Sequence, residues 1–291
     1  MTPQPVDVPP VDIPPVETQA RTLAGYADAS RLRQVHDRDW VLDQVTGAPR
    51  TLVDLGSGIG QLLQAALDRF PSLERAVGLE RSPHRIAEAT TRLSASADRV
   101  ELHEADLTTP GPISHRPDVV TMTSVLHWLY PHEDRIFTWV REHLAPDGSF
   151  LLTTYHPEAD AAGLGGEDDI VRDALTDLGI GRTVVPARFT GHGILPIATR
   201  TRTTDDLHAL LERHFTVAAV HDRDAVVSGV DAPGYARFHA ATFGDYYARL
   251  VEPARRPAFF RAVGAAAARR QDERGHVSSM TVRLWRLAHR G

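Results

Sequence analysis

The amino-acid sequence predicts an α/β protein: a doubly wound, Rossmann-like sheet of seven strands, parallel where strands and helices alternate, with helical cap insertions. The first observation behind this is the alternation of short apolar runs with helical segments across residues 48–156. The second is the stretch "TLVDLGSGIGQ" at residues 51–61, in which three glycines directly follow a strand-like run. The third is an acid at the end of each of the next two strand-like runs, Glu80 and Asp106.

The N-terminal part contains two kinds of segment. Residues 1–16 are rich in proline and lack a helical period, so we expect a disordered or extended leader. Residues 17–47 have the apolar spacing of one or two helices, which we assign to the cap. No basic segment followed by an apolar one is visible here, and we expect a cytoplasmic chain.

Residues 48–156 form the predicted Rossmann-like core. One of its helices is expected to begin after Ser82, whose side chain can cap free N–H groups, with Pro83 at the first helical position. The strand-like runs of the whole chain are 50–56, 75–80, 99–106, 117–125, 148–156, 216–224 and 276–290, and the helical segments include 61–70, 82–97, 132–146, 167–179 and 203–215.

The regular alternation stops after the core. We assign residues 157–274 to insertions and a helical substrate cap, with a core helix and strand at 203–222. Within this region, residues 231–270 look helical and are rich in aromatic side chains. These segments are long enough to cover the carboxyl edge of the sheet. Residues 275–291 are expected to be the closing strand of the core.

The composition excludes several classes of protein and site. The 291 residues include no cysteine, which rules out disulfides and thiolate metal sites, and no lysine, which rules out Schiff-base chemistry. The net charge of −6 argues against a nucleic-acid partner, and no apolar run is long enough for a membrane span. No histidine spacing typical of a metal site falls on a credible helix, so we predict no metal.

The glycine turn predicts a ligand site at the carboxyl edge of the sheet. Open α/β sheets bind ligands beyond the carboxyl ends of their strands. Gly56, Gly58 and Gly60 would let a ligand approach the main chain, and the following helix offers free N–H groups. The sequence lacks a dinucleotide phosphate-binding motif, because Gln61 occupies the position at which that motif requires a third glycine.

The two acids that follow indicate what kind of ligand the turn holds. Glu80 lies 20 residues after Gly60, where a carboxylate suits the hydroxyls of a ribose. Asp106 could accept a hydrogen bond from an exocyclic amino group, with Leu107 beside a flat base. The residues therefore predict a nucleoside site.

Five motifs in order carry a resemblance to a known family. The segments "VDLGSGIGQ", Glu80, "EADL", "SVLHWL" and "HLAPDGSFLLTTY" together resemble class I S-adenosylmethionine-dependent methyltransferases over roughly residues 48–156. The "LHWL" stretch is similar to that of the trans-aconitate methyltransferase group. The resemblance implies S-adenosylmethionine as cofactor, with its methionine end on Asp54, Gly56, Ser57 and Gly58, its ribose on Glu80, its adenine beside Asp106 and Leu107, and its methyl-transfer end lined by Ser124 to Trp128.

Methyl transfer from a sulfonium chiefly requires that nucleophile and methyl carbon are held in line. Aromatic side chains can surround the sulfonium and an acceptor, and our candidates are Tyr26, Trp128, Tyr155, Phe238 and Tyr246. A hydroxyl or carbon acceptor also needs a general base. The candidate bases are His127, after the fourth strand, and His156, at the end of the fifth, although either could be only a packed histidine.

The sequence thus predicts a methyltransferase that methylates oxygen or carbon of a small, partly apolar or aromatic acceptor in natural-product metabolism. Two alternatives stay open. One is an RNA or protein methyltransferase, against which the acidic balance argues. The other is a catalytically silent scaffold that binds S-adenosylmethionine. A homodimer is equally open.

Overall fold

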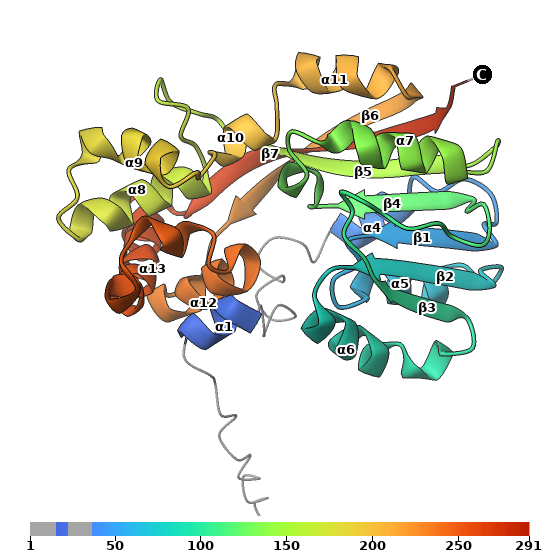
Figure 1. The fold of residues 1–291 in the computed structure, drawn as a ribbon, viewed down its shortest axis with the longest axis horizontal. Coiled ribbons are helices and arrows are strands. Elements are labelled where there is room, and N and C mark those ends of the chain that lie inside the picture. Colours follow the sequence, from blue (N-terminus) through green and yellow to red (C-terminus); the bar gives the residue numbers. More distant parts are fainter. Residues whose placement is uncertain (1–15, 23–36, 291) are drawn as a thin grey trace, which may run out of the picture.

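The structure of the chain, a computed structural model, describes residues 16–22 and 37–290 (Figure 1). The predicted leader lies outside these residues except for Val16, which begins the helix α1 (Val16–Thr22). A second N-terminal helix, α4, spans Asp37–Leu42.

Seven strands form one sheet, in the order β3-β2-β1-β4-β5-β7-β6 (Figure 1). The predicted seven-stranded α/β sheet is therefore confirmed. The pairs among β1 to β5 are parallel, and β7 runs antiparallel to both of its neighbours. The strands are β1 (Thr51–Leu55), β2 (Arg75–Glu80), β3 (Val100–Glu104), β4 (Val119–Thr123), β5 (Ser149–His156), β6 (Phe215–Val227) and β7 (Ser278–His289).

Strand β7 is the expected closing strand, and it runs antiparallel, whereas the strands of the alternating region are parallel as predicted. Strand β6 ends at Val227 at the edge of the sheet where the cap lies, and β7 begins at Ser278 at the same edge. The backbone N–H of Val277 donates to the carbonyl of Val227 at 2.8 Å, which fixes the two ends together. Because the intervening helices never return to the opposite edge, the last strand can only run backwards.

Helices cover both faces of the sheet and bury separate apolar clusters against it. One face is covered by α7 and α11, whose side chains pack with Phe150, Phe215 and Trp285. The other face is covered by α4, α5 and α6, so α4 packs on the sheet and not in the cap. As predicted, Ser82 caps α6 and Pro83 is its first residue. These helices are α5 (Gln61–Arg69), α6 (Pro83–Arg92), α7 (Glu133–His143) and α11 (Thr204–Glu212), with short 3₁₀ turns η1 (Ser94–Ser96) and η2 (Leu126–Trp128).

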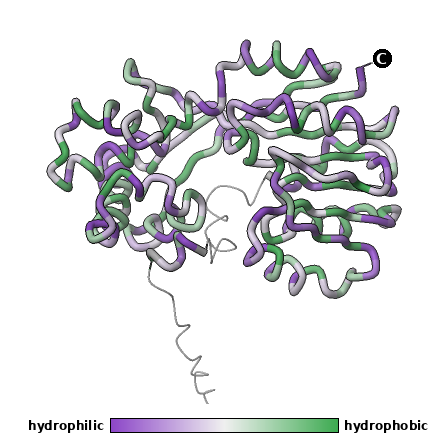
Figure 2. The backbone as a smooth tube through the Cα atoms, in the orientation of Figure 1, coloured by the Kyte–Doolittle hydropathy of each residue, from purple (hydrophilic) through white to green (hydrophobic). Residues whose placement is uncertain are grey.

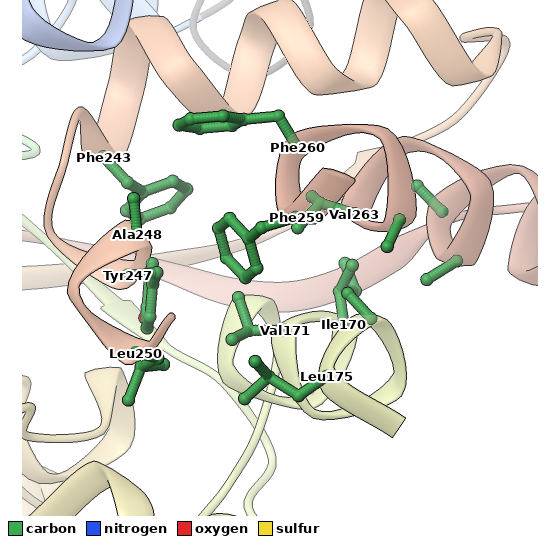
Figure 3. Close-up of a cluster of buried hydrophobic side chains, with 14 of the residues drawn as sticks. Ile170, Val171, Leu175, Phe243, Tyr247, Ala248, Leu250, Phe259, Phe260 and Val263 are labelled. Atoms are coloured by element: carbon green, nitrogen blue, oxygen red, sulfur yellow. The ribbon is translucent and has the colours of Figure 1, made fainter. Parts of the chain in front are cut away.

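The cap is a helical body with its own apolar core (Figures 1 and 3). Figure 3 shows Phe259 of α13 pointing toward Val171 of α8, while Phe260 points to the other side of α13. Figure 2 shows hydrophobic segments both in this body and in the sheet. Of the N-terminal helices, α1 packs here, against α12 and α13. The remaining elements are α8 (Glu167–Asp177), η3 (Arg182–Val184), α9 (Val185–Gly191), α10 (Ile197–Arg200), α12 (Ala232–Phe243), η4 (Tyr247–Leu250), η5 (Pro253–Arg255) and α13 (Arg256–Arg274).

Candidate active site

A cavity of about 700 Å³ lies between the carboxyl ends of the parallel strands and the cap. Its wall contains the glycine turn after β1, the last residues of β2, β4 and β5, and side chains of α8 and α12. Its floor is therefore the edge at which open α/β sheets bind ligands. Its roof is the helical cap.

The glycine turn owes part of its composition to its own packing. Gly56 and Gly60 both have φ of 75°, in the left-handed region that favours glycine. A Cβ on Gly56 would lie 2.4 Å from a methyl of Val125, and one on Gly60 would lie 2.7 Å from a methyl of Leu93. Gly58 also has a left-handed φ, of 55°. The conformation of the turn itself thus favours glycine at all three positions, whereas the sequence analysis explained them by the approach of a ligand.

The Glu80 carboxylate is held by two backbone N–H groups at the cavity wall. The N–H of Gly58 donates to Oε2 at 3.0 Å, and the N–H of Ser82 donates to Oε1 at 2.8 Å. Only 7% of the side chain is exposed. Each oxygen keeps a further lone pair, so the carboxylate can accept two hydrogen bonds from a diol without moving.

Asp54, the last acid before the turn, is buried beside Glu80. Its Oδ1 accepts a hydrogen bond from the hydroxyl of Thr121 at 2.8 Å. Burial raises the pKa of Asp54 to about 7 against the opposing effect of the Thr121 hydrogen bond, and the charge of Glu80 contributes to the rise. A cationic group bound next to Asp54 would favour its ionised form.

Ser57 supplies a second buried polar group at the glycine turn. Its Oγ is buried and has no hydrogen-bond partner among the described residues. Such a group is costly unless a ligand or water satisfies it. The amino-acid end of S-adenosylmethionine carries an ammonium and a carboxylate, and its ribose carries a diol. Asp54, Ser57 and Glu80 fit these groups.

The third strand ends in the residues expected beside the adenine. Asp106 is exposed, and its Oδ1 accepts hydrogen bonds from the N–H and the hydroxyl of Thr108, both at 2.8 Å. These hydrogen bonds lower the pKa of Asp106, so it is an anionic acceptor at neutral pH. Leu107 is buried and also lines the cavity, which gives a flat base an apolar surface.

The segment after β4 has an unusual backbone where it reaches the cavity. Ser124 has φ of 62°, a conformation that is rare for a residue with a side chain. Its N–H donates to the hydroxyl of Thr153 at 3.2 Å, and its own hydroxyl is hydrogen-bonded to that of Tyr155. Ser124 and Tyr155 thus join the ends of β4 and β5 at the cavity wall.

Aromatic rings from the sheet and the cap meet across the cavity. The Trp128 ring lies 5.0 Å from that of His127 and 5.5 Å, edge to face, from that of Tyr246 in the cap. The guanidinium of Arg200 lies 4.5 Å from both the Trp128 and the Tyr246 rings. These contacts hold a partly exposed aromatic wall in place.

The structure brings most of the sequence-predicted site residues to this one cavity. Of the two candidate bases, only His127 lines the cavity. The predicted substrate residue Tyr26 lies outside the described residues. The remaining predicted residues that line the cavity are Asp54, Gly56, Ser57, Gly58, Glu80, Asp106, Leu107, Ser124, Trp128, Tyr155, Phe238 and Tyr246.

His156 is not among the residues that line the cavity. As the next residue after Tyr155 on β5, it points to the opposite face of the sheet. There its Nε2 lies 2.8 Å from the Thr154 hydroxyl. Burial and the nearby charge of Arg283 lower the pKa of His156 to about 4, so it is neutral at pH 7.

The sequence analysis missed an acid in the cavity wall. Glu167, the first residue of α8, lines the cavity and is 1% exposed. Its partners Tyr235 and His239 come from α12, 68 and 72 residues further along the chain. The sequence shows only an acidic run, "EDD", at a helix start, which more often lies in solvent.

Residues 16–22 and 37–290 contain no group of three or more His, Cys, Asp or Glu side chains that could hold a metal ion. Within the same ranges, no helix has the length and apolarity needed to cross a membrane.

The core is similar in sequence to known methyltransferases. Residues 53–150 match the family model described as "Methyltransferase domain". Trans-aconitate 2-methyltransferase of Acidovorax sp. (strain JS42) is 35% identical over 101 residues, which cover 35% of this chain and 36% of that protein. The match thus spans about a third of that relative's length. The trans-aconitate 2-methyltransferase of Methylobacterium radiotolerans is 28% identical over 228 residues, covering 72% of this chain and 80% of that protein.

Solved structures share the fold over most of the chain. A methyltransferase of Thiobacillus denitrificans in complex with S-adenosylhomocysteine is similar with a TM-score of 0.57 and 16% identity, covering 96% of this chain and 100% of that one. One of Geobacter sulfurreducens, in the same kind of complex, has a TM-score of 0.55 and 16% identity, covering 90% and 96%. The [4+2]-cyclase SpnF has a TM-score of 0.52 and 18% identity, covering 87% and 80%. The fold is therefore that of these proteins, while the fold alone does not assign the reaction.

Proposed function

Since residues 53–150 carry a methyltransferase domain of the class I S-adenosylmethionine-dependent family, we propose that the chain transfers a methyl group from S-adenosylmethionine to a small acceptor under the cap. One observation carries the proposal. The eight residues proposed to bind the cofactor all line a single cavity that also reaches the aromatic residues of the cap. A site for the cofactor alone would not need that second half.

Each part of the cofactor has a proposed partner. Asp54 and Ser57 would hold the amino-acid end, Glu80 the ribose, and Asp106 with Leu107 the adenine. When bound, the cofactor supplies an electrophilic methyl group on a sulfonium. The protein's own contribution is to align the acceptor, exclude water and remove a proton where the acceptor carries one.

The proposed acceptor is small and partly apolar or aromatic, it is methylated on oxygen or carbon, and the reaction belongs to natural-product metabolism. The walls offered by Trp128, Tyr155, Phe238 and Tyr246 support this choice. His127 lies among them and is retained as a candidate base. His156 is a weaker candidate because it faces away from the cavity.

Binding calorimetry with S-adenosylmethionine and S-adenosylhomocysteine tests the proposal. We expect micromolar binding to the wild type and at least a tenfold loss in Glu80→Gln. The matched control is Glu104→Gln, because Glu104 is opposite Glu80 in the β2–β3 register but is exposed and outside the cavity. Absence of binding at high micromolar concentrations, or equal binding by the two variants, would remove the proposal.

A carboxylate acceptor is the second candidate. Relatives are named for trans-aconitate, and Arg21 and Arg249 line the cavity from exposed positions in the cap. Arginine suits planar carboxylates. RNA or protein methylation and a silent scaffold remain alternatives; methyl transfer to bulk RNA or a protein extract, or binding without turnover, would favour them.

A further inference from the structure

Asp54 and Glu80 place two buried carboxyl groups at the ends of neighbouring parallel strands. Asp54 lies in β1, Glu80 is the last residue of β2, and both line the cavity. They are 2% and 7% exposed. Within the part of the chain that the structure describes, neither forms an ion pair. Two neighbouring carboxyl groups without a cation are costly to ionise together in a buried site.

The two carboxyl groups differ in their hydrogen bonds. Glu80 accepts from the backbone N–H groups of Gly58 and Ser82, and such donors stabilise its charge. Asp54 accepts a hydrogen bond on Oδ1, whereas its Oδ2 accepts none from the described residues. Burial, aided by the charge of Glu80, raises the pKa of Asp54 to about 7 against the Thr121 hydrogen bond. Below neutral pH the pair therefore holds one proton, on Asp54.

The hydrogen bond to Asp54 comes from behind the cavity wall. Thr121 is the partner of Asp54 in the β1–β4 register, is fully buried and does not line the cavity. Its hydroxyl lies 2.8 Å from Asp54 Oδ1 and 3.5 Å from the Val53 carbonyl, so it donates chiefly to the carboxyl. A donor to the charged form lowers the pKa of a carboxyl group. Thr121 thus opposes the effect of burial on Asp54.

Other charged or titratable groups line the same cavity without pairing with these two carboxyl groups. They are Arg38 of α4, Arg81 after β2, Arg85 of α6, Asp106 after β3, His127 of η2 and Glu167 of α8. The charge that acts on the pKa of Asp54 is that of Glu80. A bound cation would therefore supply the positive charge that favours the ionised form of Asp54.

We propose that cofactor binding is coupled to the release of one proton from Asp54, and that Thr121 is a positioning residue that keeps this carboxyl able to ionise. The inference rests on the proposed function and deepens it. Asp54 meets the ammonium at the amino-acid end of the cofactor. The O–H bond of Asp54 breaks, its electron pair stays on the carboxylate, and the proton passes to solvent. Cofactor affinity consequently falls as the pH drops below neutrality, because proton and ammonium compete for one carboxylate.

Calorimetry on the full chain counts the proton directly. S-adenosylhomocysteine is titrated at pH 6 and pH 7 in cacodylate and in imidazole buffer, whose enthalpies of ionisation differ, so the difference in observed enthalpy gives the number of protons released. We expect about 0.9 proton at pH 6, about 0.5 at pH 7, and roughly 20-fold weaker binding at pH 5.5 than at pH 7.5. Binding with the same enthalpy in both buffers at pH 6 would overturn the proposal. Absence of binding would instead remove the proposed function itself.

Asp54→Asn identifies the group that releases the proton. The variant keeps the shape of the side chain and an oxygen that can accept from Thr121. The matched control is Asp272→Asn, which changes an exposed acid outside the cavity. We expect Asp54→Asn to release under about 0.2 proton at pH 6 and to bind with a flat pH profile, while the control behaves as the wild type. Release of as many protons by Asp54→Asn as by the wild type would assign them to another group, such as His127, and would overturn the proposal.

Thr121→Val tests the positioning role without changing a residue of the cavity wall. Loss of the hydroxyl removes the hydrogen bond that opposes the rise in the pKa of Asp54. Proton release at pH 7 should therefore increase to about 0.8, and the midpoint of the affinity profile should move to higher pH. Thr121→Ser, which keeps the hydroxyl, should restore the wild-type profile. A purely structural role would weaken binding equally at every pH, and that result, or an unchanged profile, would overturn the proposal.

Discussion

The buried carboxyl of Asp168 should make the stability of this protein depend on pH. Its side chain is fully buried, and burial raises the pKa of Asp168 to about 7, against hydrogen bonds from Tyr247 and the Ile197 N–H and against the charge of Arg200. In the unfolded chain the same group has its ordinary pKa of 3.8. Between these two values the native state binds more protons than the unfolded state, so stability falls as pH rises.

The substitution Asp168→Asn removes this dependence while keeping the contacts. The amide oxygen can accept from the Ile197 N–H, and the amide nitrogen can donate to the Tyr247 hydroxyl, which replaces the two hydrogen bonds at 2.7 and 2.6 Å. For one group with these two pKa values, linkage gives a loss of about 2.5 kcal/mol in the free energy of unfolding between pH 5 and pH 7.5. The variant should lack that loss.

Urea unfolding of three proteins at pH 5 and pH 7.5 measures the effect. The wild type, Asp168→Asn and the exposed control Asp272→Asn share every other titrating group, including Asp54, so those contributions cancel in the comparison. We expect Asp168→Asn to gain about 2.5 kcal/mol relative to both others as the pH is raised. Equal pH dependence in all three would mean that Asp168 is already ionised at pH 5 in the native protein, and would refute the reasoning.

Three further predictions follow from the packing. Gly47 and Gly56 have nearly the same φ, 76° and 75°, but a Cβ on Gly47 would meet nothing within 4 Å, whereas one on Gly56 would displace Val125. We therefore expect Gly47→Ala to lower the free energy of unfolding by about 1 kcal/mol and Gly56→Ala to lower it by about 2 kcal/mol more. Equal losses in urea unfolding would contradict this. Arg202→Leu should lower the free energy of unfolding by about 3–5 kcal/mol, because it leaves the Glu133 carboxylate, which is 1% exposed, without its cation. Arg213→Leu breaks an exposed pair with Asp134 and should lower it by under about 1 kcal/mol. Similar losses in the two variants would contradict this. The pKa of His156 is lowered from 6.5 to about 4, so the free energy of unfolding should decrease as the pH falls from 6.5 to 4. In His156→Gln this decrease should be smaller. The same decrease in the variant and the wild type, measured by urea unfolding, would count against the prediction.

The sheet and the cofactor side of the site were predictable because both are local in sequence. Each strand is a short apolar run, and Asp54, Glu80 and Asp106 lie at or next to strand ends, where one edge of a parallel sheet collects them. The direction of β7 was not predictable, because it depends on where the cap returns the chain.

The acceptor side could not be predicted for a different reason. Glu167, Tyr235 and His239 meet through a loop and two helices separated by tens of residues, and no periodic pattern links them. His156 was predicted as a candidate base because it lies at a strand end. Successive side chains of a β-strand point to opposite faces of the sheet, so Tyr155 faces the cavity and His156 faces away from it.

The hydrogen bond between Val277 and Val227 brings the two ends of the larger helical segment of the cap together. Residues 228–276 leave β6 and rejoin β7 at this pair, and they also pack on α1 and α8, while the glycine turn belongs to the other half of the sheet. A replacement segment from a relative would therefore have to preserve both its paired ends and its packing surfaces on α1 and α8. Under the proposed function, such a replacement would change the acceptor side without altering the turn that holds the cofactor.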